Sequence, residues 1–436
     1  MTSVSGSISR LADRRLNVTR LPGVWQCFPV AVLVRLAYLF AMPTPFLPFD
    51  RSAYWALASS LLLNGSLADG GRPVTDFEPV YPIFLAATRW LSGNSALTVQ
   101  VIQVVIASIG TIYLYRLADA LTGNRQIALI AAWLYALHPL LIRQAAAPAE
   151  SALFTTLLIA FTYYFVTAAG AASMAFAGLV LGLMVVTRMM ILPLAALAAA
   201  LLMARRRYSS ALALALPVVL LLLPFCIRNW SVNGSVWPTR SGVNLYIGNS
   251  PYTAALLPDY DLDILQEHAA VAGGLVSLSG DSPESIQAAD ELLTGYALDY
   301  IRAHPIRTLR QKAINAAYFF SPLLVPFYVA GPDTRAVIDQ TGHLVVENPE
   351  RRPAVEHIVY SAFYAPVLIA ALAGVYIRRR DFRRDAILWC VVANFVFVYT
   401  LYFPATRYRA PMDFVLLLYA AVSLNLWLTR WRRQRL

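Results

Sequence analysis

The sequence carries little charge and almost no lysine. Only 14% of its 436 residues are charged, whereas soluble domains carry about 25%. Hydrophobic residues make up 58% of the chain, so the composition excludes an ordinary soluble protein. Lys312 is the one lysine. Any site for a phosphate group would therefore have to use mainly arginine, whose planar guanidinium suits bidentate phosphate contacts.

Cysteine is equally scarce. Cys27, Cys226 and Cys390 all lie in or at the edge of apolar segments. Their spacing fits neither a disulfide framework nor a zinc site, so we interpret them as small core residues. The first apolar segment also lacks a small-residue cleavage site, which favours a retained signal anchor over a cleaved signal peptide.

Long apolar runs, by contrast, are abundant. They are roughly 17 to 22 residues long, and each is long enough to cross a hydrocarbon core about 30 Å thick. They predict an all-α polytopic membrane protein with about ten transmembrane helices. The expected spans cover residues 27–46, 96–116, 126–142, 150–168, 174–186, 189–204, 210–226, 357–376, 385–401 and 410–428.

The net charge of +11 comes from arginine clusters near residues 10–20, 205–207, 378–384 and 430–435. Each cluster abuts an apolar run, as cytoplasmic anchors do under the positive-inside rule. This placement argues against a nucleic-acid partner. It predicts a multi-pass membrane protein with both termini in the cytoplasm.

The chain is expected to have three parts. Residues 1–226 form an N-terminal transmembrane module, and its first outer loop, residues 47–95, is the predicted catalytic loop. Residues 227–356 contain 14 of the 24 acidic residues and are expected outside the cytoplasm. Residues 357–436 supply the last transmembrane helices and a basic cytoplasmic tail.

Several shorter elements are expected between the spans. Residues 52–63 and 79–91 predict helices that lie at the membrane surface, and residues 285–302 predict an extracytoplasmic helix. The apolar segment 313–330 is ambiguous. A span there would place the basic segment 378–384 outside, against the positive-inside rule, so we interpret 313–330 as re-entrant or interfacial.

Three acids at the predicted outer boundary are the candidate catalytic residues: Asp50, Glu78 and Glu150. A carboxylate there could take the proton from an acceptor hydroxyl as the hydroxyl attacks. Each acid also has a structural interpretation. Asp50 could cap the helix that begins near Ser52, Glu78 could be a helix-start charge, and Glu150 could open the fourth span.

Arginines gather at the same boundary, where charge is costly unless it is paired or functional. Guanidinium groups could stabilise a departing phosphate. The expected residues that bind the donor phosphate are Arg51, Arg228, Arg240, Arg407 and Arg409. For Arg407 and Arg409 an ordinary role as interface anchors remains open.

The expected substrate pocket consists of Tyr54, Tyr81, Arg188, Asn244, Tyr246 and Asn249. Residues 242–249 alternate glycine with asparagine and aromatic residues, so a loop there could bring backbone amides close to a polar headgroup. A structural turn is the alternative. Asp259, Asp261 and Asp263 alternate as metal ligands can, although a solvated loop is the favoured interpretation.

These pieces, in this order, resemble the GT-C class of membrane glycosyltransferases, in particular the bacterial branch similar to protein O-mannosyltransferases and lipid A aminoarabinose transferases. The resemblance spans almost the whole chain. The matching pieces are Asp50…Tyr54, Glu78-Pro79-Val80-Tyr81-Pro82…Ala86, Pro148-Ala149-Glu150-Ser151, Arg228-Asn229, Gly242…Asn249, His304-Pro305 and Arg407-Tyr408-Arg409-Ala410-Pro411.

The resemblance implies an inverting transfer of a sugar from a polyprenyl-phosphate donor, such as undecaprenyl phosphate, to an acceptor outside the membrane. The acceptor would be a protein, lipid A or a cell-envelope glycan. Asp50 matches the acid treated as catalytic base in the family, and Glu150 matches a second acid near the acceptor. The arginines of the 228 and 407–409 motifs would hold the lipid phosphate.

One departure from the family concerns the first loop. Many relatives have two adjacent acids there, whereas Arg51 follows Asp50 in this chain. A divalent metal is therefore possible but not favoured, and no other cofactor is expected. The alternatives to an enzyme are a flippase for lipid-linked oligosaccharides and a non-catalytic subunit of envelope assembly. The polar residues gather at one face rather than through the midplane, which favours the enzyme over the flippase.

Overall fold

The computed structural model describes residues 23–41, 49–238, 240–275, 282–329, 334–338, 344–402 and 404–435. These residues are mainly helical, and the strands among them form three two-stranded antiparallel sheets. The expected all-α fold class is confirmed. The basic segment near residues 10–20 lies outside the described residues.

Five helical segments are long and apolar enough to cross a membrane. They are α2 (Val24–Ala41), α5 (Ala96–Thr122), α11 (Tyr208–Asn233), α17 (Ala354–Ile377), and the stretch Thr406–Gln434, which comprises α19 (Thr406–Arg409), η6 (Ala410–Met412) and most of α20 (Asp413–Arg435). A sixth is the bent pair α6 (Arg125–Ala136) and α7 (Pro139–Ala146).

Four further apolar helical segments are shorter: α8 (Ser151–Thr167), α9 (Ala171–Val185), η3 (Met189–Ile191) with α10 (Leu192–Ala204), and α18 (Ala386–Leu401). All ten apolar runs expected to span therefore form helices over their described residues. By length and composition only five or six described segments qualify as full spans, so the expected count of ten is not confirmed.

The bend between α6 and α7, 53°, has a local cause. Pro139 has no N–H to continue the helix, and the preceding His138 caps α7 by accepting a hydrogen bond from Leu141 N, 3.4 Å away. Arg35 of α2 is fully buried and donates to the carbonyl oxygens of Tyr135 and Ala136 at the break. A buried guanidinium thus satisfies carbonyl groups near the end of α6.

Two helix crossings depend on glycine. A Cβ atom at Gly178 of α9 would lie 2.3 Å from the carbonyl oxygen of Leu214 in α11. A Cβ at Gly374 of α17 would lie 1.9 Å from the carbonyl oxygen of Tyr419 in α20. Small residues at such crossings let helix backbones approach closely within a membrane.

The first outer loop is an ordered unit. It comprises η2 (Phe49–Arg51), α3 (Ala53–Asn64), the hairpin of β1 (Ala68–Asp69) and β2 (Arg72–Pro73), and α4 (Val80–Leu91). The Arg89 guanidinium lies 4.0 Å from the Trp55 ring centre and donates to the Trp55 carbonyl oxygen, which ties α4 to α3. The helices expected at 52–63 and 79–91 are confirmed.

The described residues between 240 and 353, here called the head region, contain a second apolar core. Its helices are α12 (Ser241–Gly248), α13 (Thr253–Leu256), η4 (Leu262–Leu265), α14 (Gln266–Ala272), α15 (Pro283–Ala303) and α16 (Pro305–Phe319). Its strands are β3 (Tyr328–Val329), β4 (Arg335–Ile338), β5 (Leu344–Glu347) and β6 (Glu350–Arg351). The helix expected at 285–302 is confirmed as α15.

The ambiguous segment 313–330 forms no continuous spanning helix over its described residues, because α16 ends at Phe319. Phe319 is fully buried, and its ring stacks on Tyr399 of α18 at 5.8 Å. The end of α16 therefore docks on the end of α18. Its depth relative to a membrane stays a prediction, as does the division of the chain into three parts.

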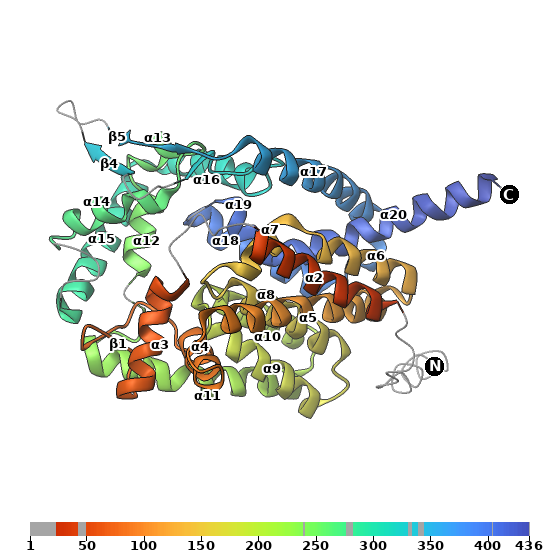
Figure 1. Ribbon diagram of the computed structural model, residues 1–436, viewed down its shortest axis with the longest axis horizontal. Coiled ribbons are helices and arrows are strands. Elements are labelled where there is room, and N and C mark those ends of the chain that lie inside the picture. Colours follow the sequence, from red (N-terminus) through yellow and green to blue (C-terminus); the bar gives the residue numbers. More distant parts are fainter. Residues whose placement is uncertain are drawn as a thin grey trace.

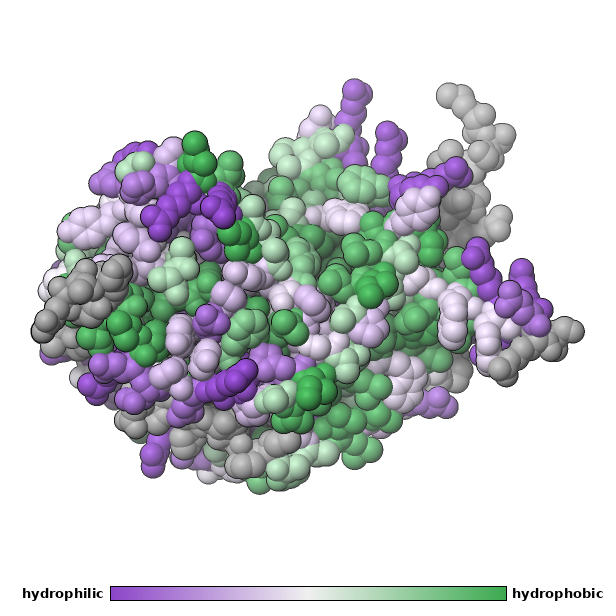
Figure 2. Space-filling model, turned by 90° about the horizontal axis from the view of Figure 1, so that it is seen from above, coloured by the Kyte–Doolittle hydropathy of each residue, from purple (hydrophilic) through white to green (hydrophobic). Residues whose placement is uncertain are grey.

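The molecule has two polar ends and an apolar middle. Figure 1 shows the head region at one end of the helical bundle, with the end of α20 at the other. Figure 2 shows hydrophobic residues gathered over the middle of the visible face and hydrophilic residues toward both ends. This pattern fits a helical bundle that lies across a membrane.

Candidate functional site

The first element of the candidate site is an ion pair between Glu150 and Arg188. Arg188 Nη2 lies 3.0 Å from Glu150 Oε1, and the two side chains are 18% and 8% exposed. Glu150 immediately precedes α8, and Arg188 lies in the turn between α9 and η3. The guanidinium also faces the rings of Phe154 and Tyr408, at 5.7 and 5.6 Å. Two segments of the bundle thus share a largely buried pair of opposite charges.

Glu78 joins the same turn from the first outer loop. Its Oε1 accepts a hydrogen bond from the backbone N–H of Met189 at 2.8 Å. Nearby, Val80 N donates to the carbonyl oxygen of Val186. Burial raises the pKa of the Glu78 carboxyl to about 7, although the Met189 amide acts in the opposite direction. Glu78 therefore exchanges its proton near neutral pH.

Tyr54 of α3 completes the contact between the loop and the bundle. Its ring lies edge-on to Phe77 at 5.0 Å and to Tyr81 at 4.9 Å. The pKa of Tyr54 is raised well above its usual value, mainly by burial. The negative charges of Glu150 and Glu78 and a hydrogen bond with Glu150 act in the same direction. The structure thus brings together Tyr54, Glu78, Glu150 and Arg188, which we call the acidic cluster.

Asp50 stands apart from these paired groups. It is exposed in η2, four residues before Tyr54, and among the described residues no hydrogen bond or ion pair engages its carboxylate. Ser52, rather than Asp50, caps α3, since Ser52 Oγ accepts from Trp55 N at 3.2 Å. Phe49 packs edge-on against Trp55 at 5.9 Å and anchors the turn. Asp50 is therefore a free carboxylate on a fixed turn.

Arg51, the next residue, is also exposed, and no partner for its guanidinium occurs in the described part of the chain. Tyr81, by contrast, is 1% exposed, and its hydroxyl donates to Gln103 Oε1 at 2.7 Å. Gln103 Nε2 in turn donates to the carbonyl oxygens of Ala145 and Ala147. Arg51 is open to a ligand, whereas the Tyr81 hydroxyl is already used within the fold.

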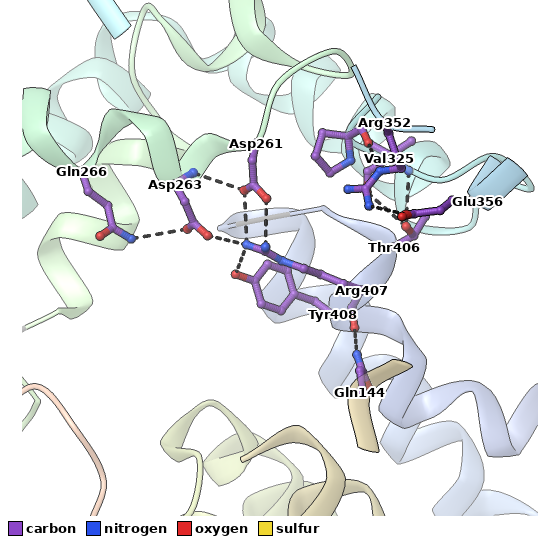
Figure 3. A network of polar contacts seen from close by, with 11 residues as sticks. Gln144, Asp261, Asp263, Gln266, Val325, Arg352, Glu356, Thr406, Arg407 and Tyr408 are labelled. Atoms are coloured by element: carbon purple, nitrogen blue, oxygen red, sulfur yellow. Dashed lines mark hydrogen bonds and ion pairs between the residues drawn. The ribbon is translucent and has the colours of Figure 1, made fainter. Parts of the chain in front are cut away.

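Arg407 connects the membrane bundle to the head region (Figure 3). Its guanidinium pairs with Asp261 at 3.0 Å and also with Asp263, and it donates to the Tyr408 hydroxyl at 2.8 Å. Gln144 of α7 donates to the Arg407 carbonyl oxygen at 2.7 Å. Two of the three alternating aspartates are therefore engaged by an arginine: Asp261 is 9% exposed and Asp263 is partly exposed, whereas Asp259 remains exposed. No group of three metal-ligating side chains occurs among the described residues.

Arg409 is enclosed by the protein. Its side chain is 0% exposed and pairs with Asp413 at 2.8 Å. It also donates to the Phe319 carbonyl oxygen at 2.7 Å and to the Tyr360 hydroxyl. Asp413 pairs in addition with His138 at 3.1 Å. Arg409 therefore holds the bundle together in this conformation.

The two other expected phosphate ligands lie near the first outer loop. Arg228 of α11 donates to the Leu67 carbonyl oxygen at 2.8 Å. Arg240 pairs with Asp76 at 3.0 Å and lies 5.0 Å from the Phe77 ring centre. Both arginines keep partly exposed side chains, so they fix the loop and remain within reach of solvent.

The tract 242–249 forms helix α12 rather than a loop of free amides. The N–H groups of Gly242 and Val243 donate to Asp290 Oδ1 at 2.8 and 3.0 Å, so these amides are not open to a headgroup. Tyr246 packs in the head core and contacts His268 through its hydroxyl. Asn249 is buried and binds backbone carbonyl groups, while Asn244 is partly exposed in α12. These three residues do not join the acidic cluster.

Sequence reasoning gave no functional role to Lys312 of α16. Its Nζ donates to the carbonyl oxygens of Gly248 and Leu401, each at 2.9 Å. The one feature of the sequence that could have pointed to this residue is that Lys312 is the only lysine of the chain. Its location at the junction of α12, α16 and α18 depends on three segments that are distant in sequence, and no local pattern predicts that junction.

The comparisons with known proteins agree with this architecture. Residues 72–230 match the family model described as dolichyl-phosphate-mannose-protein mannosyltransferase. The crystal structure of an Archaeoglobus fulgidus oligosaccharyltransferase tethered to an acceptor peptide aligns with 93% of the chain, at a TM-score of 0.50 and 14% identity. The chain has the GT-C fold. The resemblance to GT-C glycosyltransferases of the O-mannosyltransferase and aminoarabinose-transferase type is thereby confirmed.

The chain aligns with 50% of the archaeal oligosaccharyltransferase, so it spans about half the length of that protein. ArnT from Cupriavidus metallidurans, solved with undecaprenyl phosphate, aligns with 97% of the chain and 79% of its own length, at a TM-score of 0.39 and 13% identity. No curated protein matches the chain.

Proposed function

We propose that the protein is an inverting glycosyltransferase that moves a sugar from a polyprenyl-phosphate-linked donor to an acceptor hydroxyl or amine outside the cytoplasm. The acceptor is a protein, lipid A or a cell-envelope glycan. The observation that carries the proposal is the contrast between Asp50 and the acidic cluster. Glu150 is held by Arg188, and Glu78 is held by the Met189 amide. Asp50 lies on the same outer loop as Glu78, but its carboxylate is exposed.

The chemistry follows from this arrangement. The acceptor oxygen or nitrogen attacks the anomeric carbon, and a new glycosidic bond forms as the bond to the donor phosphate breaks. The leaving group is the polyprenyl phosphate, and the acceptor proton passes to Asp50, which acts as general base. Arg51 lies next to this carboxylate and faces solvent, so it is the arginine best placed to meet the developing phosphate charge.

The acidic cluster has a separate role in this proposal. The loop must stay fixed against the bundle if Asp50 is to keep its geometry, because catalytic rates depend on well-oriented reacting groups. Tyr54, Glu78 and Glu150 provide this fixation through contacts to Arg188 and the following turn. Glu150 also lies where the family resemblance implies an acid close to the acceptor.

The two polar ends of the molecule support an arrangement across the membrane. The first outer loop and the head region lie at one end of the bundle in Figure 1, and the arginine-rich segments 205–207 and 378–384 belong to neither unit. We propose that the basic segments face the cytoplasm of a bacterial inner membrane. Both termini would then be cytoplasmic, and Asp50 would face the periplasm or the cell exterior.

The test uses the full chain in sealed proteoliposomes that contain polyprenyl-phosphate sugars and a native membrane extract as acceptor. Wild-type protein and a D69N variant should release free polyprenyl phosphate, because Asp69 is an exposed acid of the same loop with no assigned role. D50N should not release it. Donor that crosses the bilayer intact, without release by the wild-type protein, would overturn the enzyme in favour of a flippase.

A further inference from the structure

Lys312 is a partly buried cation that has no acidic partner among the described residues. Its two described hydrogen bonds go to neutral carbonyl groups, those of Gly248 and Leu401. No carboxylate pairs with it among the described residues, and burial alone lowers the pKa of its amine to about 8. Removing a charge from water without a counter-ion is unfavourable. An ammonium in this position is suited to an anion that the protein itself does not supply.

A small cleft lies beside Lys312, between residues 248–254 and the α15–α16 junction. Its wall includes Asn249, Tyr300, Arg307, Thr308, Gln311 and Lys312, and none of its lining residues is acidic. Arg307 is exposed, and no partner engages its guanidinium in the described part of the chain. The cleft is therefore lined by two positive charges and several polar groups.

Two buried polar atoms in this wall lack hydrogen-bond partners within the described structure: Asn249 Oδ1 and Thr308 Oγ1. The orientation of the Asn249 amide is fixed, since its Nδ2 donates to the carbonyl oxygens of Leu245 and Leu401. Buried polar groups are nearly always hydrogen-bonded. The two unpaired atoms share this wall with two cations, so the cleft suits a polar ligand with both acceptor oxygens and an O–H group.

We propose that this cleft binds a phosphate monoester or hydrogen phosphate through Arg307, Thr308 and Lys312. The cleft has an inner volume of about 20 Å³, which accommodates one water-sized group. One phosphate oxygen fits inside it, and the rest of the ligand extends outward past Arg307. The ammonium and the Thr308 hydroxyl donate to phosphate oxygens, and a P–OH group donates to Asn249 Oδ1.

The position of the cleft connects it to the acidic cluster. Leu401, whose carbonyl binds Lys312, ends α18 two residues after Tyr399. The Tyr399 ring stacks on Tyr408 at 5.1 Å, and Tyr408 faces Arg188. A lipid phosphate in the cleft would be the polyprenyl phosphate product after it has left Arg51 at the site of transfer. This assignment to the lipid rests on the proposed function, whereas the phosphate site itself does not.

The experiment measures binding to the purified full-length protein by calorimetry in a non-ionic detergent. The probes are inorganic phosphate, farnesyl phosphate and farnesol. The variants are R307Q, which removes the exposed charge, and K312M, which removes the ammonium. R302Q is the matched control, because Arg302 lies on the same helical hairpin and pairs only with exposed Asp299 in the described structure.

We expect farnesyl phosphate to bind the wild type and R302Q with equal affinity. Its affinity for R307Q and K312M should be at least tenfold lower. Any affinity for farnesol should be the same in the wild type and the variants. Equal affinity for inorganic phosphate would assign the cleft to free phosphate, and weaker affinity would assign it to a lipid phosphate. Unchanged binding in R307Q, or no binding of either phosphate, would overturn the site and leave Lys312 as a cap of α18.

K312M also loses two hydrogen bonds to the backbone, so R307Q decides the outcome if K312M does not fold. Failure of the phosphate site is distinguishable from failure of the proposed function. D50N should keep phosphate binding and lose sugar transfer, whereas R307Q should weaken phosphate binding directly, with no transfer reaction needed for the measurement.

Discussion

Glu150 and Arg188 lie 3.0 Å apart and connect the start of α8 to the turn that follows α9. The same turn receives Glu78 from the first outer loop through the Met189 amide. Residues 186–189 are therefore one of the contacts that hold the loop with Asp50 on the bundle. Substitutions at this segment should act on catalysis through the position of the loop.

The Glu150–Arg188 pair should contribute more to the free energy of unfolding than a surface ion pair does. Its side chains are 8% and 18% exposed, so either E150Q or R188Q alone leaves a largely buried charge unpaired, at a cost of about 3–5 kcal/mol. Thermal unfolding in detergent checks this. The double variant E150Q/R188Q should lose less than the sum of the two single changes. Additive losses would show that the pair is not coupled.

Glu78 should make stability depend on pH. Its pKa is raised from 4.5 to about 7, so between these values the folded protein holds a proton that the unfolded chain has released. Stability should therefore fall as the pH rises from about 4.5 through 7. The E78Q variant should lose this part of the dependence in thermal unfolding scans from pH 5 to 7.5. D69N is the control. If the stability of E78Q falls with pH as steeply as that of the wild type and D69N, the raised pKa of Glu78 is contradicted.

The contact between Arg407 and the two aspartates should hold the head region on the bundle. Asp261 is 9% exposed and Asp263 is 37% exposed, so D261N should destabilise the protein more than D263N. Limited proteolysis of the head region, compared with the bundle, measures the effect. Equal protection in wild type and D261N would mean that Arg407 does not carry this contact.

The α17–α20 crossing should not tolerate a side chain at Gly374. The Cβ of G374A would lie 1.9 Å from the Tyr419 carbonyl oxygen, so the helices must separate and the unfolding temperature should fall. Gly295 of α15 is a matched control, because a Cβ there meets no atom within 4 Å. G295A should be neutral or stabilising, by up to about 1 kcal/mol from helix propensity. A smaller loss in G374A than in G295A would contradict the packing.

Local patterns in the sequence predicted the helices well, because hydrophobic runs and caps act over short distances. The apolar runs at 96–116 and 357–376 are examples, whereas the cap of α3 is Ser52 and not Asp50. The same patterns did not predict the number of full spans, because several apolar runs form helices of 17 residues or fewer. Helix length depends on where tertiary contacts end it, as at the break held by Arg35.

The site was only partly predictable, because pairing between distant charges leaves no local signal. Asp50, Glu78 and Glu150 were recognisable as boundary acids, but the Glu150–Arg188 contact joins residues 38 positions apart. Arg407 was expected to face a phosphate, and its pairing with Asp261, 146 positions earlier, needs the folded head region. Whether Arg407 exchanges these acids for a phosphate stays a prediction.

The role of Asp50 is the central claim, and the most direct measurement of it compares single-turnover sugar transfer with donor binding in wild type and D50N in lipid nanodiscs. General-base catalysis contributes about 10²–10⁴-fold to a rate. The account predicts a rate loss of this order in D50N, with donor affinity within about threefold of wild type. A D50N variant that transfers sugar at the wild-type rate would contradict the account and move the base to Glu150 or Glu78.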